Sequence, residues 1–172
     1  MNGARHKARF ARWQARVGPE TRALAELVAV RFVSRLEREG FARVDVHLRD
    51  PDSPTRPNEI QMERIVGTEL DVAYVMFASY GLPRFQVGCA RRKRDSPNEF
   101  VRAAKLVANA NEYLHFWGKP WWRPVWSWSE EDAARAVGEV EEKIGQILRF
   151  LDSGEIGPNI HAQEISKRSN TV

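Results

Sequence analysis

Two acidic residues at the head of a strongly apolar stretch are the first candidates for chemistry in this sequence. Glu69 and Asp71 stand at the beginning of the run 70–77, which has the composition of a buried strand. A strand carboxylate can hold a divalent metal ion when the next strand supplies an acid and a lysine. The next strand-like stretch instead reads Gly-Cys-Ala at residues 88–90, and Lys93 lies beyond its expected end. Because both partner groups are missing, we expect no metal-dependent hydrolysis here.

The single cysteine, Cys89, is the other group with potential for covalent chemistry. No histidine or glycine-rich loop lies near it in the sequence, and an isolated cysteine in a strand is usually a small buried apolar residue. The four histidines are too far apart for the paired spacing of a zinc site: His6, His47, His115 and His161. Glycine-rich phosphate loops and the Gly-x-Ser-x-Gly pattern are absent as well. The sequence therefore favours a protein without catalysis, cofactor or metal.

Arginines are concentrated at the N-terminus in a spacing that suits a helix. Arg5, Arg9, Arg12 and Arg16 follow one another at intervals of four, three and four residues, which places them along one stripe. Residues 1–16 hold five basic side chains and no acid, whereas the rest of the chain has a formal charge of −1. Such a stripe can contact the phosphates of a nucleic acid.

The same segment also has an apolar side, which supports a different interpretation. Phe10, Trp13 and Val17 lie beside the arginine stripe. They can dock the arm on the body of the protein or on a second copy, and the arginines are then merely solvated.

A second basic run follows the fourth expected strand and reads Arg91, Arg92, Lys93 and Arg94. A run of this kind is usually a solvated surface. It adds to phosphate binding only if it faces the same way as the N-terminal stripe.

Five of the six tryptophans fall within residues 117–128. Trp121 and Trp122, followed by Arg123, are candidates for an aromatic platform on which a base, a sugar or a peptide stacks. The alternative is a wall of the core that meets the C-terminal helix.

The elements that position these residues follow from the spacing of apolar side chains. Two stretches have helical spacing, 19–39 and 129–152. Pro19 suits the first position of a helix, Ser129 is a favourable N-cap, and Gly154 suits a helix end.

Four stretches have the pattern of strands: 41–49, 60–65, 70–77 and 84–90. The third is the most apolar, which predicts a central strand. Short connections favour antiparallel neighbours, and three prolines within residues 50–57 exclude regular structure there.

Two further segments lie between the last strand and the last helix. Ser96, followed by proline and by Glu99, forms a capping-box pattern that predicts a helix over 96–114. Residues 119–128 hold two prolines and are expected to be extended, as an edge strand or a docked loop.

Together these elements predict an α+β fold, in which an antiparallel-rich sheet of about four to five strands packs against two to three helices. The expected divisions are a basic helical arm at 1–18, one α+β domain at 19–162 and a polar tail at 163–172.

Two resemblances extend this interpretation. The stretch 77–87, the Trp-Trp segment before the last helix and the stretch 150–160 resemble a group of small bacterial α+β proteins known as domains of unknown function. This resemblance covers residues 20–162 and implies a fold rather than an activity. The order of elements around Gly67–Val72 also resembles the restriction-endonuclease type of fold, whose metal-binding acidic-x-Lys triplet is missing at 88–90.

We therefore expect a binding or regulatory domain that recognises a protein or peptide partner without catalysis. The alternative is a nucleic-acid-binding domain with a nuclease-like fold that lacks the metal site. No apolar run has the length of a membrane span, and the N-terminus lacks the apolar segment of a signal peptide, so a cytoplasmic protein without membrane contact is expected. The sequence leaves the oligomeric state open.

Overall fold

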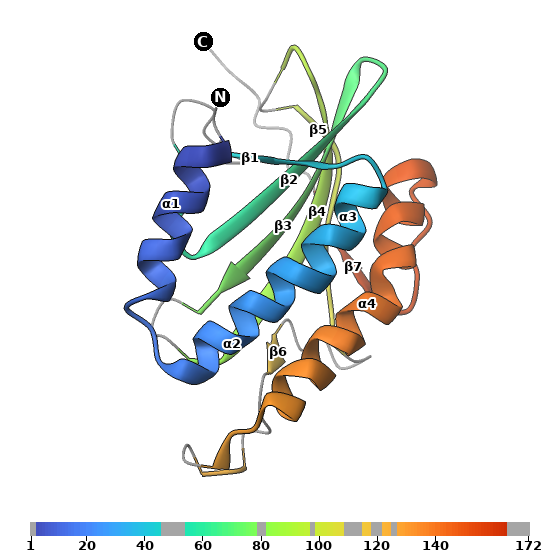
Figure 1. Cartoon of the computed structure of the whole chain (residues 1–172). Coiled ribbons are helices and arrows are strands. Elements are labelled where there is room, and N and C mark those ends of the chain that lie inside the picture. The colour runs from blue at the N-terminus through green and yellow to red at the C-terminus, as the bar shows by residue number, and fades with distance from the viewer. Residues whose placement is uncertain are drawn as a thin grey trace.

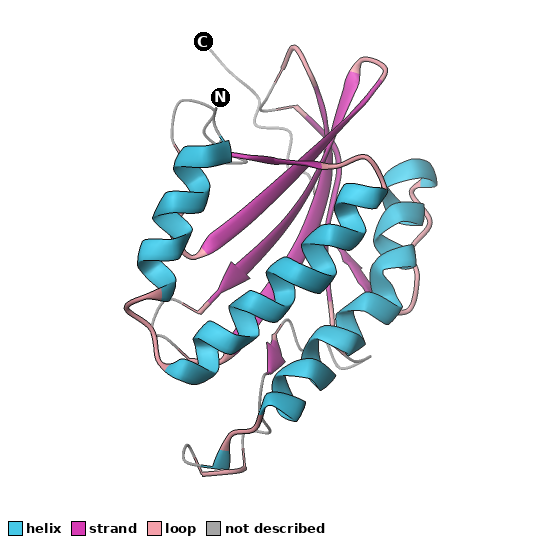
Figure 2. Cartoon of the chain, in the orientation of Figure 1, coloured by secondary structure: helices cyan, strands magenta, loops and turns pink. Residues whose placement is uncertain are grey.

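The protein folds as one antiparallel sheet with helices packed across one of its faces (Figure 1, Figure 2). A computed structural model of the chain describes residues 3–45, 54–78, 82–96, 99–108, 115–117, 122–124 and 127–164. The α+β architecture predicted from the sequence is confirmed.

The strands of the sheet follow one another in the order β1-β2-β3-β4-β5-β7, and every described pair is antiparallel. The short strand β6 pairs separately with the first two residues of β4. The bounds are β1 Ala42–Val44, β2 Glu59–Val66, β3 Glu69–Phe77, β4 Arg84–Lys93, β5 Phe100–Leu106, β6 Phe116–Trp117 and β7 Ile160–Ala162. The sheet is therefore wider than expected, although β2 to β4 form the antiparallel series that the short connections predict.

Among the described residues, three helical segments cover the sheet (Figure 1). The first is α1, Gly3–Gln14; the second joins α2 Pro19–Leu27, the π-helical turn η1 Val28–Val33 and α3 Ser34–Arg38; the third is α4, Glu130–Ser153. The predicted helices at 19–39 and 129–152 are thus confirmed. Ser129 caps α4, and Gly154 ends it with a φ of 82°, a backbone conformation that glycine adopts without strain.

The hydrophobic core lies between the sheet and these helices. Side chains at alternate positions of each strand face the helices, as with Val75 in β3 and Val87 in β4, which are opposite each other in register. From α4, Val137, Val140 and Ile144 are buried in the same core. No described helix covers the opposite face of the sheet.

Helix α1 belongs to this core as well. The Phe10 side chain is 3% exposed, and its ring centroid lies 5.9 Å from that of Phe77 in β3. Trp13 packs against the core at 5.3 Å from Phe77. The apolar side of the arm is therefore packed against the body of the protein.

The helix predicted over 96–114 is wrong for residues 100–106, which form β5. Ala104 and Leu106 point to the core opposite Cys89 and Val87 of β4. The alanines and valines in this stretch fit a helical and an alternating pattern equally well, so the local signal was ambiguous. Pairing with β4, which is distant in sequence, favours the strand. Residues 97–98 and 109–114 lie outside the described residues.

Two strand boundaries also differ from the sequence prediction. The fourth strand extends beyond residue 90 to Lys93, so it includes most of the second basic run. Within the predicted stretch 41–49, β1 covers Ala42–Val44, and residues 46–49 lie outside the described part of the chain.

No helix in the described part of the chain combines the length and the apolar character needed to cross a bilayer.

Candidate functional site

The N-terminus of α4 builds a small polar network that extends to the protein surface. Ser129 Oγ accepts a hydrogen bond from the backbone N–H of Asp132 at 3.3 Å, and the Asp132 carboxylate accepts one from the N–H of Ser129 at 3.3 Å. This capping box fixes the Asp132 side chain, which is 8% exposed. The helix start thereby places a carboxylate where a neighbouring cation can bind it.

Arg123 is that cation, and it connects the helix start to an exposed tryptophan. Its Nη1 donates to Asp132 at 3.3 Å, and its guanidinium carbon lies 5.5 Å from the centroid of the Trp122 ring. Trp122 is 65% exposed. The aromatic ring therefore lies at the surface beside a cation that is itself held in place, an arrangement suited to stacking against a partner group.

The other tryptophans of the cluster have different positions, and Trp117 belongs to strand β6. Trp128 is partly buried and packs against the core, which agrees with the core-wall interpretation for this residue. Trp121 and Trp126 lie outside the described residues. Residues 122–124 and 127–128, the described parts of the predicted extended segment, contain no strand.

The arginine stripe of α1 is also divided. Arg5, Arg12 and Arg16 are exposed. Arg9 instead donates to the Asp45 carboxylate at 2.5 Å and to the Thr55 carbonyl at 2.8 Å. One of the four arginines therefore fastens the helix to the body of the protein.

His6 contributes a second attachment of α1, which the sequence interpretation missed. Its ring is fully buried; Nε2 donates to the carbonyl of Glu59 at 2.6 Å, and Nδ1 accepts from Arg43 Nε at 2.9 Å. Burial and the nearby Arg43 charge lower the pKa of His6 to about 4. His6 precedes Phe10 by one helical turn, so it lies on the apolar side of the helix. This position in the sequence was the signal that could have predicted its burial.

The second basic run does not form one patch, because successive strand residues point to opposite faces. Arg91 points toward the helices and donates to Asp71 from Nε at 2.6 Å. Arg92 points away from them, with Nη2 3.2 Å from Glu63. Both arginine side chains are buried.

The last two members of the run differ from the first two. Lys93 pairs with Glu99 at 2.6 Å, and both side chains are about half exposed. Arg94 is exposed. The interpretation of 91–94 as a uniformly solvated run is therefore corrected for its buried first half.

Of the three groups that the sequence singled out for chemistry, Asp71 and Cys89 are held in unreactive surroundings, and Glu69 pairs with Arg91 at 3.4 Å. Each oxygen of Asp71 accepts hydrogen bonds from guanidinium groups, with Arg91 on Oδ1 and with Arg64 and Arg91 on Oδ2. Burial, followed by the Asp71 charge, raises the pKa of the Cys89 thiol to about 12, so it stays protonated at neutral pH. Within the described residues, no three His, Cys, Asp or Glu side chains are grouped so that they could hold a metal ion.

No protein-family model, curated protein or solved structure matches this chain. The resemblance to bacterial α+β domains of unknown function therefore stays a prediction.

Proposed function

We propose that this protein is a non-catalytic binding domain that recognises a protein or peptide partner, with Trp122 and Arg123 in the contact surface. The observation that carries the proposal is the exposed Trp122 ring beside Arg123, which Asp132 holds from the capping box of α4.

Trp and Arg are the side chains most enriched among residues that dominate binding energy at protein interfaces. A large apolar ring in water is unfavourable, and covering it with a partner group removes that apolar surface from solvent. The Arg123–Asp132 contact restrains the cation before binding, which lowers the conformational entropy that association costs. These three properties support recognition of a partner at this surface.

The surroundings of Asp71 and Cys89 support the non-catalytic part of the proposal. A carboxylate saturated by guanidinium groups has no open oxygen for a metal ion or a proton transfer. A buried thiol with a raised pKa is a poor nucleophile.

Nucleic-acid binding remains the alternative prediction, with narrower support. The exposed arginines Arg5, Arg12 and Arg16 favour it. However, Arg9, Arg91 and Arg92 each contact a carboxylate of the protein itself, which reduces the positive charge available to phosphates.

The test is selection of peptides from a random display library on the full chain, followed by calorimetric titration of an enriched peptide. Trp122→Ala should weaken binding about tenfold or more, as expected for a central interface residue. Val30→Ala is the matched control, because Val30 is an exposed apolar residue on η1 with 68% exposure. The Val30→Ala variant should bind the enriched peptide with the same affinity as the wild type.

The proposal is wrong if no peptide is enriched, or if Trp122→Ala and Val30→Ala bind alike. A parallel titration with a labelled single-stranded oligonucleotide tests the alternative. Salt-sensitive binding that falls on Arg12→Gln and is unchanged in Trp122→Ala would favour nucleic acid.

A further inference from the structure

The outer side of α1 is a helix face that the fold leaves exposed. Figure 1 shows α1 at the border of the helical layer, with α2 and the sheet on its inner side. The centre line of the outer face consists of exposed alanines at intervals of four, three and four residues: Ala4, Ala8, Ala11 and Ala15. The Ala15 N–H donates to the Ala11 carbonyl at 3.0 Å, so the helical turn continues to the last of them.

Basic side chains lie on both sides of this alanine line. In the heptad numbering of helix pairs, the four alanines occupy the two seam positions, and Arg5, Lys7 and Arg12 occupy the positions that flank the seam. All three basic side chains are exposed, and α1 contains no acidic residue. The outer face of α1 is therefore positively charged along both borders and attracts a partner with negative charge.

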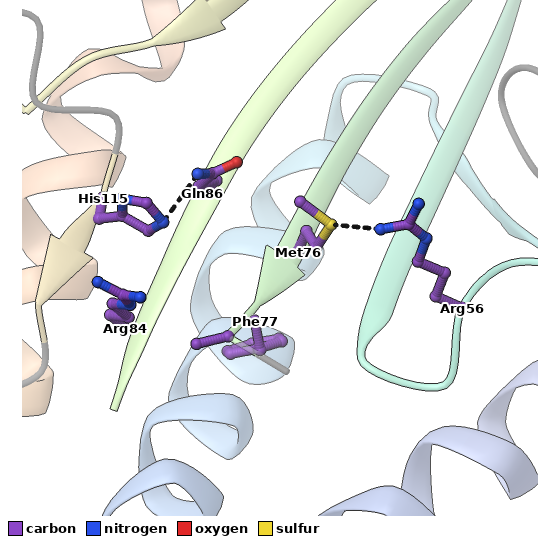
Figure 3. Close-up of a pocket in the computed structure, with 7 residues that line it drawn as sticks. Arg56, Met76, Phe77, Arg84, Gln86 and His115 are labelled. Carbon is purple, nitrogen blue, oxygen red and sulfur yellow. Dashed lines mark hydrogen bonds between the residues drawn. The ribbon is translucent and has the colours of Figure 1, made fainter. Parts of the chain in front are cut away.

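The inner side of α1 is fixed on the sheet, so the outer face is presented by a helix that is already formed. The rings of Phe10 and Trp13 lie 5.9 and 5.3 Å from the ring of Phe77 at the end of β3. Phe77 also lines a recess of about 200 Å³, together with Arg84 and His115 (Figure 3). A partner that binds the outer face does not have to order the helix, which lowers the entropy that association costs.

The distribution of charge decides which kind of partner fits. Two copies of α1 paired along the alanine line would bring Arg5, Lys7 and Arg12 against the same side chains of the other copy, and like charges at these positions repel. A nucleic acid would place phosphates against methyl groups along the centre of the contact, and methyl groups donate no hydrogen bond to phosphate. A helix with an apolar seam between acidic residues matches both the alanine line and its basic borders.

We propose that the outer face of α1 binds an acidic amphipathic helix of another protein. The larger apolar side chains of that helix lie against the alanines, and its carboxylates pair with Arg5, Lys7 and Arg12. The small alanine side chains allow the two helix axes to approach closely, because the distance between packed helices depends on the side chains at the contact. The inference does not rest on the proposed function, because the α1 face and the Trp122 surface share no residue.

The test is titration of a fluorescein-labelled synthetic peptide with the full chain, followed by fluorescence anisotropy. The peptide has three heptads with leucine at the seam positions and glutamate at the flanking positions, so copies of the peptide repel one another at neutral pH. We expect saturable binding with a Kd of about 1–100 μM. Two comparison peptides should bind about tenfold more weakly or not at all: one with lysine in place of glutamate, and a scrambled peptide of the same composition that lacks the seam.

Variants of α1 test the seam and its borders separately. Ala11→Gln places a longer polar side chain on the alanine line and should weaken binding about tenfold. The double variant Arg5→Gln with Arg12→Gln should weaken binding about fivefold, because two exposed ion pairs are lost. These side chains are exposed, so the melting temperature should stay at the wild-type value. Arg94→Gln removes an exposed arginine that follows β4 and is the matched control, with wild-type affinity expected.

The proposal is overturned if the glutamate peptide does not saturate, if either comparison peptide binds as well, or if Arg94→Gln loses as much affinity as the double variant. Tighter binding of a DNA duplex of about 20 base pairs than of the glutamate peptide, unchanged in Ala11→Gln, would overturn it in favour of nucleic acid. A dimer of the full chain in analytical ultracentrifugation that Ala11→Gln dissociates would overturn it in favour of a second copy. If Ala11→Gln lowers the melting temperature, Ala8→Gln on the same line decides the outcome.

Discussion

Arg91 of β4 and Asp71 of β3 form a two-point ion pair across neighbouring strands of the sheet. Arg91 Nε lies 2.6 Å from one carboxylate oxygen and Nη2 lies 3.0 Å from the other. Asp71 is fully buried, and Arg64 adds a third contact at 2.7 Å. Asp152 at the end of α4 joins the same group, 2.8 Å from Arg64. The network links three neighbouring strands, β2, β3 and β4, to the last helix.

Replacing Asp71 with asparagine should destabilise the fold strongly. The change removes the charge that compensates two arginines, of which Arg91 is buried. Breaking a buried ion pair from one side costs about 3–5 kcal/mol. The free energy of unfolding, measured by urea titration with tryptophan fluorescence, should fall by this amount.

Glu99→Gln is the control for that experiment. It removes the pair with Lys93, whose side chains are 54% and 55% exposed. The expected cost is about 0–1 kcal/mol, as for surface ion pairs. Equal losses for the two variants would mean that the Asp71 network contributes no more than an exposed pair.

His6 should make stability depend on pH in a defined direction. Its pKa is about 4 in the folded protein against an ordinary value of 6.5, so the unfolded chain takes up the proton first as the pH falls. The stability that the buried, neutral His6 contributes to the fold is therefore complete above pH 6.5. It is lost as the pH falls from 6.5 through 4. The loss reaches about 3 kcal/mol near pH 4, since one pKa unit corresponds to about 1.4 kcal/mol.

The variant His6→Gln isolates this effect. Glutamine can still donate to the Glu59 carbonyl, but it does not titrate. The difference in unfolding free energy between wild type and variant should narrow by about 3 kcal/mol between pH 7 and pH 4. A constant difference across this range would show that His6 does not titrate in the way its burial implies.

Ile144→Ala tests the packing of α4 on the core. Ile144 is 4% exposed, so its truncation should cost about 2–5 kcal/mol of unfolding free energy. Ile156→Ala provides the comparison, because Ile156 is 64% exposed and its truncation should change stability by less than about 0.5 kcal/mol. Thermal and urea unfolding of both variants measure the contrast. A cost below about 0.5 kcal/mol for Ile144→Ala would contradict its assignment to the core.

The attachment of α1 can be tested on its apolar and basic sides separately. Phe10→Ala should destabilise the protein by about 3–5 kcal/mol, because the ring is buried against Phe77 and Trp13. Arg12→Ala on the same helix should be nearly neutral, since Arg12 is exposed. Deletion of residues 1–17 should lower the melting temperature by several degrees. An unchanged melting temperature after deletion would show that α1 is not part of the cooperative unit.

Much of the fold follows from local pattern in the sequence. The helices at 19–38 and 130–153 have unambiguous apolar spacing together with start and stop residues, Pro19, Ser129 and Gly154 among them. The short connection between β2 and β3 predicts an antiparallel pair in the same way. These features depend on residues close in sequence, so sequence alone predicts them.

The segment 100–106 shows where local pattern fails. Its alanines are compatible with a helix, and the capping-box pattern at Ser96 favoured one. The strand forms because β4 offers backbone hydrogen bonds and because Ala104 and Leu106 then reach the core. Both partners are non-local, so no window of sequence around residue 100 contains the deciding information.

The candidate sites show the same division between local and tertiary information. The sequence determined which residues carry charge, but the expected strand ended at residue 90, so the opposite directions of Arg91 and Arg92 followed only from the observed extent of β4. Only the tertiary structure decided that Asp71 and Glu63 meet those arginines, and that Arg84 and His115 come together in one recess. Side-chain partners depend on strand register and on helix docking, which are set by the whole core rather than by any one segment.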